Sequence, residues 1–97
     1  ESGQPVILDF YADWCIPCHE LDRATFTDQR VIAATERFVR LKVNVDLPSS
    51  AELAQRFAIA GVPTIVFLGT DGEEQAAARV VGFVGPDEFL KQVEKVN

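Results

Sequence analysis

Residues 8–20 read LDFYADWCIPCHE, and this stretch decides the predicted fold. Its first part belongs to a short run of β-branched, aromatic and other apolar residues over 5–11, which is typical of a buried strand in a parallel sheet. A turn at 12–14 follows, and a helix is predicted to begin near Cys15. Two cysteines, Cys15 and Cys18, therefore lie where a strand turns into a helix.

The remaining sequence alternates between helical and strand periodicity. A helix is predicted from Cys15 (capped by Asp13 or Trp14) to residues 23–25, followed by a second short helix capped at Thr27-Asp28. A strand with clean apolar–polar alternation covers 39–46, and a helix then begins at Pro48 and ends at Gly61. A hairpin of strands 64–68 and 79–83 and a helix starting at Pro86 complete the chain. A β-α-β crossover gives a parallel pair, and the hairpin adds antiparallel strands. The sequence thus predicts an α/β fold with one central mixed sheet of four to five strands and helices on both faces.

Composition narrows the class of protein. Of the 97 residues, 47% are hydrophobic and 25% are charged, as in an ordinary soluble domain. The chain contains no methionine, not even an initiator, so we expect residues 1–97 to be a single domain excised from a larger protein. The net charge is −6 and the basic residues are scattered, which argues against a nucleic-acid partner. No apolar run approaches the roughly 20 residues of a membrane span, so we expect no direct membrane insertion of this domain.

The cysteine motif allows three kinds of chemistry. Cys-x-x-Cys-His is also the attachment signature of a c-type haem, but such a haem usually needs a second axial Met or His, and the chain has no Met and only one His. A structural zinc site needs a fourth ligand besides Cys15, Cys18 and His19, and three ligands within five residues are crowded. A redox dithiol needs only the two cysteines, and it carries two electrons with no metal and no dissociable cofactor.

The position of the pair on the helix suggests a division of labour. Cys15 near the helix N-terminus is close to free backbone N–H groups, which stabilise a thiolate. Cys18 lies one turn further on the same side and can close a disulfide. We therefore expect Cys15 to be the exposed attacking thiol and Cys18 the buried resolving thiol, with His19 an ordinary solvated helix residue.

With these motifs, LDFYADWCIPC and GVPT at 61–64, the chain resembles the thioredoxin superfamily over nearly its whole length. The resemblance implies a cis bond between Val62 and Pro63 that faces the disulfide. It implies that Asp9 is a buried acid that relays a proton to the resolving thiol, with Lys42 near it, and that Trp14 lies beside the active site. From the residues alone, Pro63 could instead begin a strand, Asp9 and Lys42 could face solvent, and Trp14 could serve packing.

Two departures from ordinary thioredoxins point to a particular branch. The usual Gly-Pro between the cysteines is replaced by Ile16-Pro17, and the following helix is broken at TFTDQRV. The pattern YADWCxxCxELDxxTFTDxxV resembles the C-terminal thioredoxin-like domains of the DsbD family. In that family an acid seven residues after the first cysteine modulates its thiol, and Asp22 occupies this position, where the family more often has Glu.

The resemblance also implies partners. They would be other thiol or disulfide proteins, engaged through mixed disulfides at Cys15, with a membrane-embedded cysteine pair as electron donor and another periplasmic domain as acceptor. The domain would be a monomeric periplasmic part of an inner-membrane protein. The docking rim would consist of Trp14, Ile16, Pro17, Val62 and Pro63. The alternatives are a free-standing cytoplasmic thioredoxin reduced by a flavoenzyme, and a non-catalytic docking module.

The direction of electron flow is a further hypothesis. Four acids lie near the cysteines in sequence, and no Lys or Arg appears until Arg23: Asp9, Asp13, Glu20 and Asp22. Nearby negative charge disfavours a thiolate and so does not favour the reduced form. If even two of these acids lie close in space, the reduced form is not specially favoured, and the pair should be a reductant.

Overall fold

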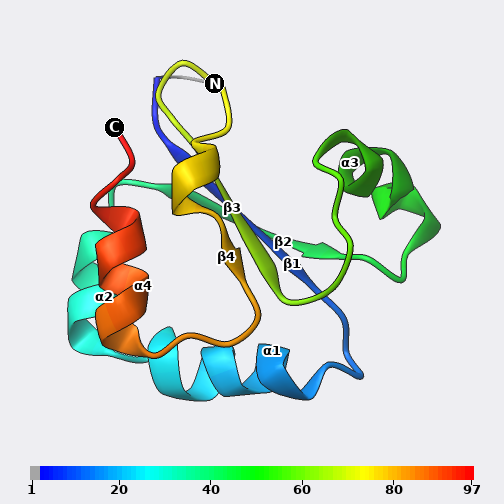
Figure 1. Ribbon diagram of the computed structural model, residues 1–97, viewed down its shortest axis with the longest axis horizontal. Coiled ribbons are helices and arrows are strands. Elements are labelled where there is room, and N and C mark those ends of the chain that lie inside the picture. Colours follow the sequence, from blue (N-terminus) through cyan, green and yellow to red (C-terminus); the bar gives the residue numbers. More distant parts are fainter. Residues whose placement is uncertain (1–2) are drawn as a thin grey trace.

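The computed structural model describes residues 3–97. Its elements in chain order are β1 (Val6–Tyr11), α1 (Ile16–Glu20), the π-helical segment η1 (Leu21–Thr25), α2 (Gln29–Ala34), β2 (Val39–Asn44), the short η2 (Pro48–Ser50), α3 (Ala51–Arg56), β3 (Thr64–Leu68), the short η3 (Ala76–Ala78), β4 (Val80–Val81) and α4 (Pro86–Val93). The strands form one sheet in the order β2-β1-β3-β4 (Figure 1). The β1–β2 pair is parallel, whereas β3 is antiparallel to both β1 and β4. The predicted mixed sheet flanked by helices is confirmed, with four strands in the part of the chain described.

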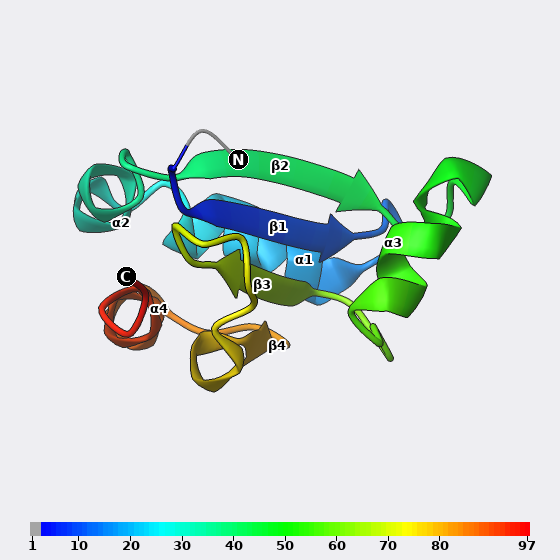
Figure 2. The ribbon, with the colours of Figure 1, turned by 90° about the horizontal axis from the view of Figure 1, so that it is seen from above.

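The hydrophobic core is split between the two faces of the sheet because side chains along a strand alternate. On one face, Ile7 of β1 and Phe67 of β3 pack against α1–η1, α2 and α4, with Phe89 at the centre. On the other face, Phe10 packs against Phe57, which directly follows α3. Figure 2 shows α3 near the carboxyl ends of β1 and β2. The central strand β1 is therefore buried on both faces, as its apolar sequence predicts.

The edge strand β2 behaves differently from its predicted pattern. Its alternation would bury one face, yet Val39 and Leu41 are 36% and 49% exposed. Both line an apolar groove of about 450 Å³ that also includes Leu8, Leu53 and Phe57. The physical reason is that the six-residue α3 covers only part of this face of the sheet.

The break predicted after the cysteine helix is present. The helical backbone of α1 and η1 ends at Thr25, whose hydroxyl donates to the Val84 carbonyl at 2.6 Å. Asp28 then caps α2, because its Oδ1 accepts from the Arg30 backbone N–H at 2.9 Å. The chain can thus turn after η1 and return α2 to the same face of the sheet.

Among the described residues, no helix combines the length and the apolar character needed to cross a bilayer.

Phe89 is the best test of the larger core cluster. Its ring is fully buried and lies 5.3 Å from the Phe26 ring and 5.8 Å from the Phe67 ring between centroids. We expect Phe89→Ala to lower the free energy of unfolding by about 3–5 kcal/mol, through lost burial and a new cavity. Phe83→Ala is the matched control, because Phe83 is 45% exposed and should cost less than about 1 kcal/mol. Urea denaturation measures both, and equal losses would contradict this description of the core.

Candidate active site

The two cysteines form a disulfide at the start of α1. Their Cα atoms are 5.2 Å apart, and Cys15 itself caps the helix, in place of the predicted Asp13 or Trp14. The Cys15 Sγ accepts a hydrogen bond from the Cys18 backbone N–H at 3.1 Å. Pro17 suits the first turn, where a backbone N–H has no partner within the helix. The cap geometry thus directs a backbone donor at the sulfur predicted to attack.

The disulfide is more enclosed than the sequence suggested. Cys18 is buried as expected, but Cys15 is only 2% exposed, so the prediction of an exposed Cys15 is wrong for this disulfide form. Both cysteines pack against Ala12, with Tyr11, Val45 and Val62 around them. The exposed groups are the neighbours in sequence: Trp14 is 68% and Ile16 72% exposed.

The second motif lies beside this cluster. The Val62–Pro63 peptide bond is cis, as the resemblance implied, and Pro63 is fully buried immediately before β3. Val62 is half-buried and packs against the cysteine cluster. Two segments that are more than 40 residues apart in sequence therefore meet at the disulfide.

Asp9 is a buried carboxylate in the middle of β1. It is only 8% exposed, and burial raises its pKa from 3.8 to about 6, because the ionised form loses its hydration. The positive charge of Lys42 opposes this rise, the negative charge of Asp22 adds to it, and Arg40 opposes it more weakly. Asp9 shares a face of β1 with Ile7, and that face is covered by α1–η1.

Lys42 connects Asp9 with Asp22. It lies directly opposite Asp9 in the parallel β1–β2 register, and its Nζ donates to Asp22 Oδ2 at 3.2 Å. The Nζ also lies 4.4 Å from the centroid of the Tyr11 ring. Asp22 belongs to η1, four residues after Cys18 in the helical backbone that carries the cysteine pair. The structure thus brings together three of the residues singled out in the sequence.

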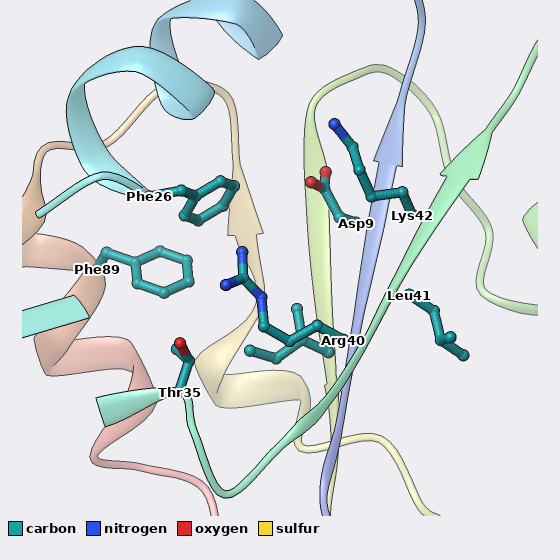
Figure 3. A pocket seen from close by; sticks show the side chains of 8 residues that line it. Asp9, Phe26, Thr35, Arg40, Leu41, Lys42 and Phe89 are labelled. Atoms are coloured by element: carbon teal, nitrogen blue, oxygen red, sulfur yellow. The ribbon is translucent and has the colours of Figure 1, made fainter. Parts of the chain in front are cut away.

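A cavity of about 20 Å³ borders Asp9, with room for about one water molecule (Figure 3). Asp9 and Lys42 lie side by side there, while the Arg40 side chain extends toward Phe26. The Arg40 guanidinium lies 5.2 Å from the Phe26 ring centroid, and Phe89 lines the same cavity. Asp9 is therefore enclosed by two cations and by aromatic rings.

The four acids near the cysteines do not form one uncompensated cluster, but two of them, Asp9 and Asp22, lie close enough to affect one another, as the sequence argument required. Glu20 pairs with Arg23 one helical turn away, and Asp22 pairs with Lys42 from β2. Asp13 contributes its backbone carbonyl, 2.8 Å from the Nε2 of His19, which is exposed. Sequence proximity missed the partner of Asp22, because Lys42 lies in β2, 20 residues further along the chain. Asp9 and Asp22 remain as two acids that act on one another.

One residue of the site was missed by the sequence reasoning. The Trp14 Nε1–H donates to Asp46 Oδ2 at 2.8 Å, although the two residues are 32 positions apart. The sequence did contain a signal for this contact. Asp46 follows β2 and Trp14 follows β1, and the carboxyl ends of two neighbouring parallel strands lie at the same edge of a sheet. Beside them is an open hollow of about 320 Å³, lined by Trp14, Val45, Ala54, Ile59, Ala60, Gly61 and Val62.

Across residues 3–97, no three His, Cys, Asp or Glu side chains gather as a metal site would require.

Comparisons with known proteins agree with this geometry. The sequence model of the family described as "Thioredoxin-like domain" matches residues 1–97. The chain belongs to the thioredoxin-like domain family. It is 44% identical over 96 residues to the thiol:disulfide interchange protein DsbD of Ralstonia nicotianae, and this match covers 97% of the chain and 16% of that protein. The chain thus spans about one sixth of the length of this curated relative.

Solved structures extend the comparison to the fold. The oxidised C-terminal domain of Neisseria meningitidis DsbD matches with a TM-score of 0.81 and 32% identity, over 100% of this chain and 84% of that one. A thioredoxin from Thermus thermophilus matches with a TM-score of 0.83 and 32% identity, over 96% and 73%. The Cys15–Cys18 disulfide thus lies at the start of α1 in a thioredoxin-like domain, and a cysteine pair of this kind can undergo thiol–disulfide exchange.

The buried carboxylate predicts a pH dependence of stability. Because the pKa of Asp9 rises from 3.8 to about 6 on folding, the folded domain holds this proton more tightly than the unfolded chain does. The stabilisation by protonated Asp9 is therefore full below about pH 4 and is lost as pH rises through about 6. We expect the free energy of unfolding of Asp9→Asn to fall less than that of wild type between pH 4 and 7, by up to about 3 kcal/mol.

Urea denaturation of the disulfide form at several pH values measures this difference. Asp71→Asn, in an exposed turn, is the matched control and should follow wild type. Parallel pH profiles for wild type and Asp9→Asn would contradict the raised pKa.

The charges around Asp9 predict shifts of opposite sign. Lys42→Gln removes the largest opposing charge and should raise the pKa of Asp9 above 6, whereas Asp22→Asn removes a neighbouring acid and should lower it. Carboxyl carbon chemical shifts followed by NMR through a pH titration report the pKa directly. Arg30→Gln is the control, because Arg30 pairs with Asp28 and Asp87 instead. Shifts of the same sign in the two variants would rule out the arrangement.

Proposed function

We propose that this domain is a reductant that relays electrons within a DsbD-type protein. It takes two electrons from a membrane-embedded cysteine pair and passes them to a disulfide of another periplasmic domain. The dithiol Cys15–Cys18 is the carrier, with no dissociable cofactor, and the domain works as a monomer on the periplasmic side of the inner membrane. The similarity to DsbD of Ralstonia nicotianae and to the Neisseria meningitidis domain supports this assignment over the alternative of a free-standing thioredoxin.

The observation that carries the proposal is the cysteine pair at the start of α1 in a thioredoxin-like domain, whose cap geometry makes Cys15 the attacking thiol. The backbone N–H of Cys18 donates to the Cys15 sulfur at 3.1 Å in the disulfide form, so in the reduced protein it is placed to stabilise negative charge on that sulfur. The Cys15 thiolate then attacks one sulfur of the partner disulfide, whose S–S bond breaks. The partner's other sulfur leaves as a thiolate, and Cys15 is joined to the partner in a mixed disulfide.

The second step returns the domain to the form described here. Cys18, one helical turn away, loses its proton and attacks the Cys15 sulfur, and the bond between Cys15 and the partner breaks. The partner leaves with its second thiolate, which takes up a proton. The partner has gained two electrons and two protons in total, and the domain has become the Cys15–Cys18 disulfide.

Asp9 is suited to accept the proton that Cys18 releases. With a pKa of about 6 it is mostly ionised at neutral pH, yet it binds a proton far more readily than an exposed carboxylate does. It lies on the face of β1 that is covered by α1–η1, the helical segment that also carries Cys18. Lys42 and Asp22 tune this acid from opposite directions.

The same carboxylate supports a reducing role. A strong oxidant of this fold class stabilises its reduced form through an easily formed thiolate. Ionised Asp9, which faces the helical segment that carries Cys18, opposes the development of another negative charge there. The reduced form then gains no special stability and gives up its electrons readily.

The exposed rim supplies the contact with partners. Trp14 and Ile16 are largely exposed, and Pro17 is exposed beside them, while Val62 joins the rim to the cysteine cluster. Apolar side chains held in water around a buried disulfide suit a brief encounter with another protein. Pro63 precedes β3, so an extended partner segment has backbone to pair with next to it.

The redox equilibrium of Cys15–Cys18 against a dithiol buffer tests the proposal, read by alkylation and mass. We expect a potential near or below that of thioredoxin, about −270 mV. Cys15→Ser is the control and should show no two-electron couple. A value near about −120 mV would make the domain an oxidant and overturn the relay direction, and the absence of any reversible couple in wild type would favour a docking module.

A further inference from the structure

One face of the sheet gathers the groups that act on the buried carboxylate. Asp9 and Tyr11 are two residues apart in β1, so their side chains lie on the same face. Lys42 lies opposite Asp9 in the parallel β1–β2 register, and Asp22 comes from η1, which packs on this face. The Lys42 ammonium is therefore close to two acids and to one aromatic ring.

The Tyr11 ring gives the Lys42 ammonium a second point of attachment. The Nζ donates to Asp22 Oδ2 at 3.2 Å, and it lies 4.4 Å from the centroid of the Tyr11 ring. The side chains of Lys42 and Asp22 are 52% and 46% exposed, so water weakens their ion pair. The negative face of the ring attracts the cation as well, and the two contacts together restrict where the ammonium lies.

The Tyr11 ring is itself held in place by the region around the disulfide. The residue is half-buried and packs against the cluster of Ala12, Cys15 and Cys18. Its backbone carbonyl accepts a hydrogen bond from the Val45 N–H at 2.9 Å, which ties the end of β1 to the connection after β2. The ring is thus a fixed support for the more mobile lysine side chain.

The position of the Lys42 ammonium matters for Asp9. Among the charged groups that act on this acid, Lys42 has the largest effect and lowers its pKa, Asp22 raises the pKa, and Arg40 of β2 lowers it more weakly. A Coulomb interaction weakens as the charges move apart and as water enters between them. The influence of Lys42 on Asp9 therefore depends on the ammonium remaining on this face of the sheet.

We propose that Tyr11 is a positioning residue that holds the Lys42 ammonium over its ring, within reach of Asp9 and Asp22. The ring takes no part in the exchange of bonds, and it acts through the lysine. The inference rests on the proposed function, in which Asp9 accepts the proton of Cys18. Tyr11 then sets how readily that acceptor is ionised.

A double-mutant cycle tests this role in the disulfide form, in which the cysteines do not titrate. We expect Tyr11→Leu to raise the pKa of Asp9, which means a proton affinity about 2- to 5-fold higher, the size expected from losing about one exposed cation–π contact. Tyr11→Phe keeps the ring and should match wild type. In a Lys42→Gln background, Tyr11→Leu should cause no further rise, because no ammonium remains to be held. Carboxyl carbon chemical shifts in an NMR pH titration report each pKa.

Phe83→Leu is the matched control, because it removes an exposed ring from the connection between β4 and α4 and should leave the titration of Asp9 unchanged. An unchanged pKa of Asp9 in Tyr11→Leu would overturn the proposal. A lower pKa would also overturn it, because the ring would then act by keeping water away from Asp9. A rise of equal size in the Lys42→Gln background would contradict it too, since the ring would then act independently of the lysine.

The reaction of the reduced domain with 5,5′-dithiobis(2-nitrobenzoate) relates this position to the chemistry. Cys15 attacks the reagent and releases one coloured thiolate, and Cys18 then attacks the Cys15 sulfur and releases the second. If Asp9 accepts the proton of Cys18, the pH at which the second phase is half-maximal should rise in Tyr11→Leu by the same factor as the proton affinity, and stay in place in Tyr11→Phe. An unmoved pH profile beside a shifted Asp9 titration would contradict the proposed role of Asp9 as proton acceptor, whereas the NMR cycle would still decide whether Tyr11 holds Lys42.

Discussion

The structure depends on β1, a central strand that is buried on both faces and leads into the helix that carries the cysteines. Its neighbours β2 and β3 pair with both of its edges, and the two halves of the core pack above and below it. Such a strand should be entirely apolar, yet it contains Asp9. The fold accommodates this carboxylate by placing Lys42 directly opposite it in the parallel register. The site is therefore organised around the cost of burying one charge.

That cost links the chemistry to the packing. Complete neutralisation by Lys42 would lower the pKa of Asp9, and complete isolation would raise it far beyond neutrality. Lys42 forms its ion pair with Asp22, at 3.2 Å, and the pKa of Asp9 lies at about 6 between these limits. The π-helical turn of η1 contributes Asp22, which follows Cys18 by four residues. One helical segment thus carries both the resolving thiol and an acid that tunes its proposed proton acceptor.

How far the sequence predicted this arrangement depends on the range of the interactions involved. The strand and helix order, the break at TFTDQRV and the cysteine pair follow from local patterns, and the structure has all of them. The four acids were judged by sequence distance, so the pairing of Asp22 with a lysine 20 residues away was not foreseen. Asp46 was missed for the same reason. The burial of Cys15 escaped prediction because Val45 and Val62, which cover it, come from other elements.

The contrast between a buried disulfide and an exposed rim suggests how selectivity arises. A sulfur that is 2% exposed reacts only when a partner sulfur is brought directly over it, so small disulfides gain little from random collision. In the proposed function, Trp14 and Ile16 align a protein partner, since their apolar surface exchanges contact with water for contact with the partner on docking. Such alignment requires side chains with defined positions. The hydrogen bond to Asp46, just after β2, gives the Trp14 indole such a defined position. The same β1–β2 pair that positions the disulfide therefore also positions the proposed docking surface.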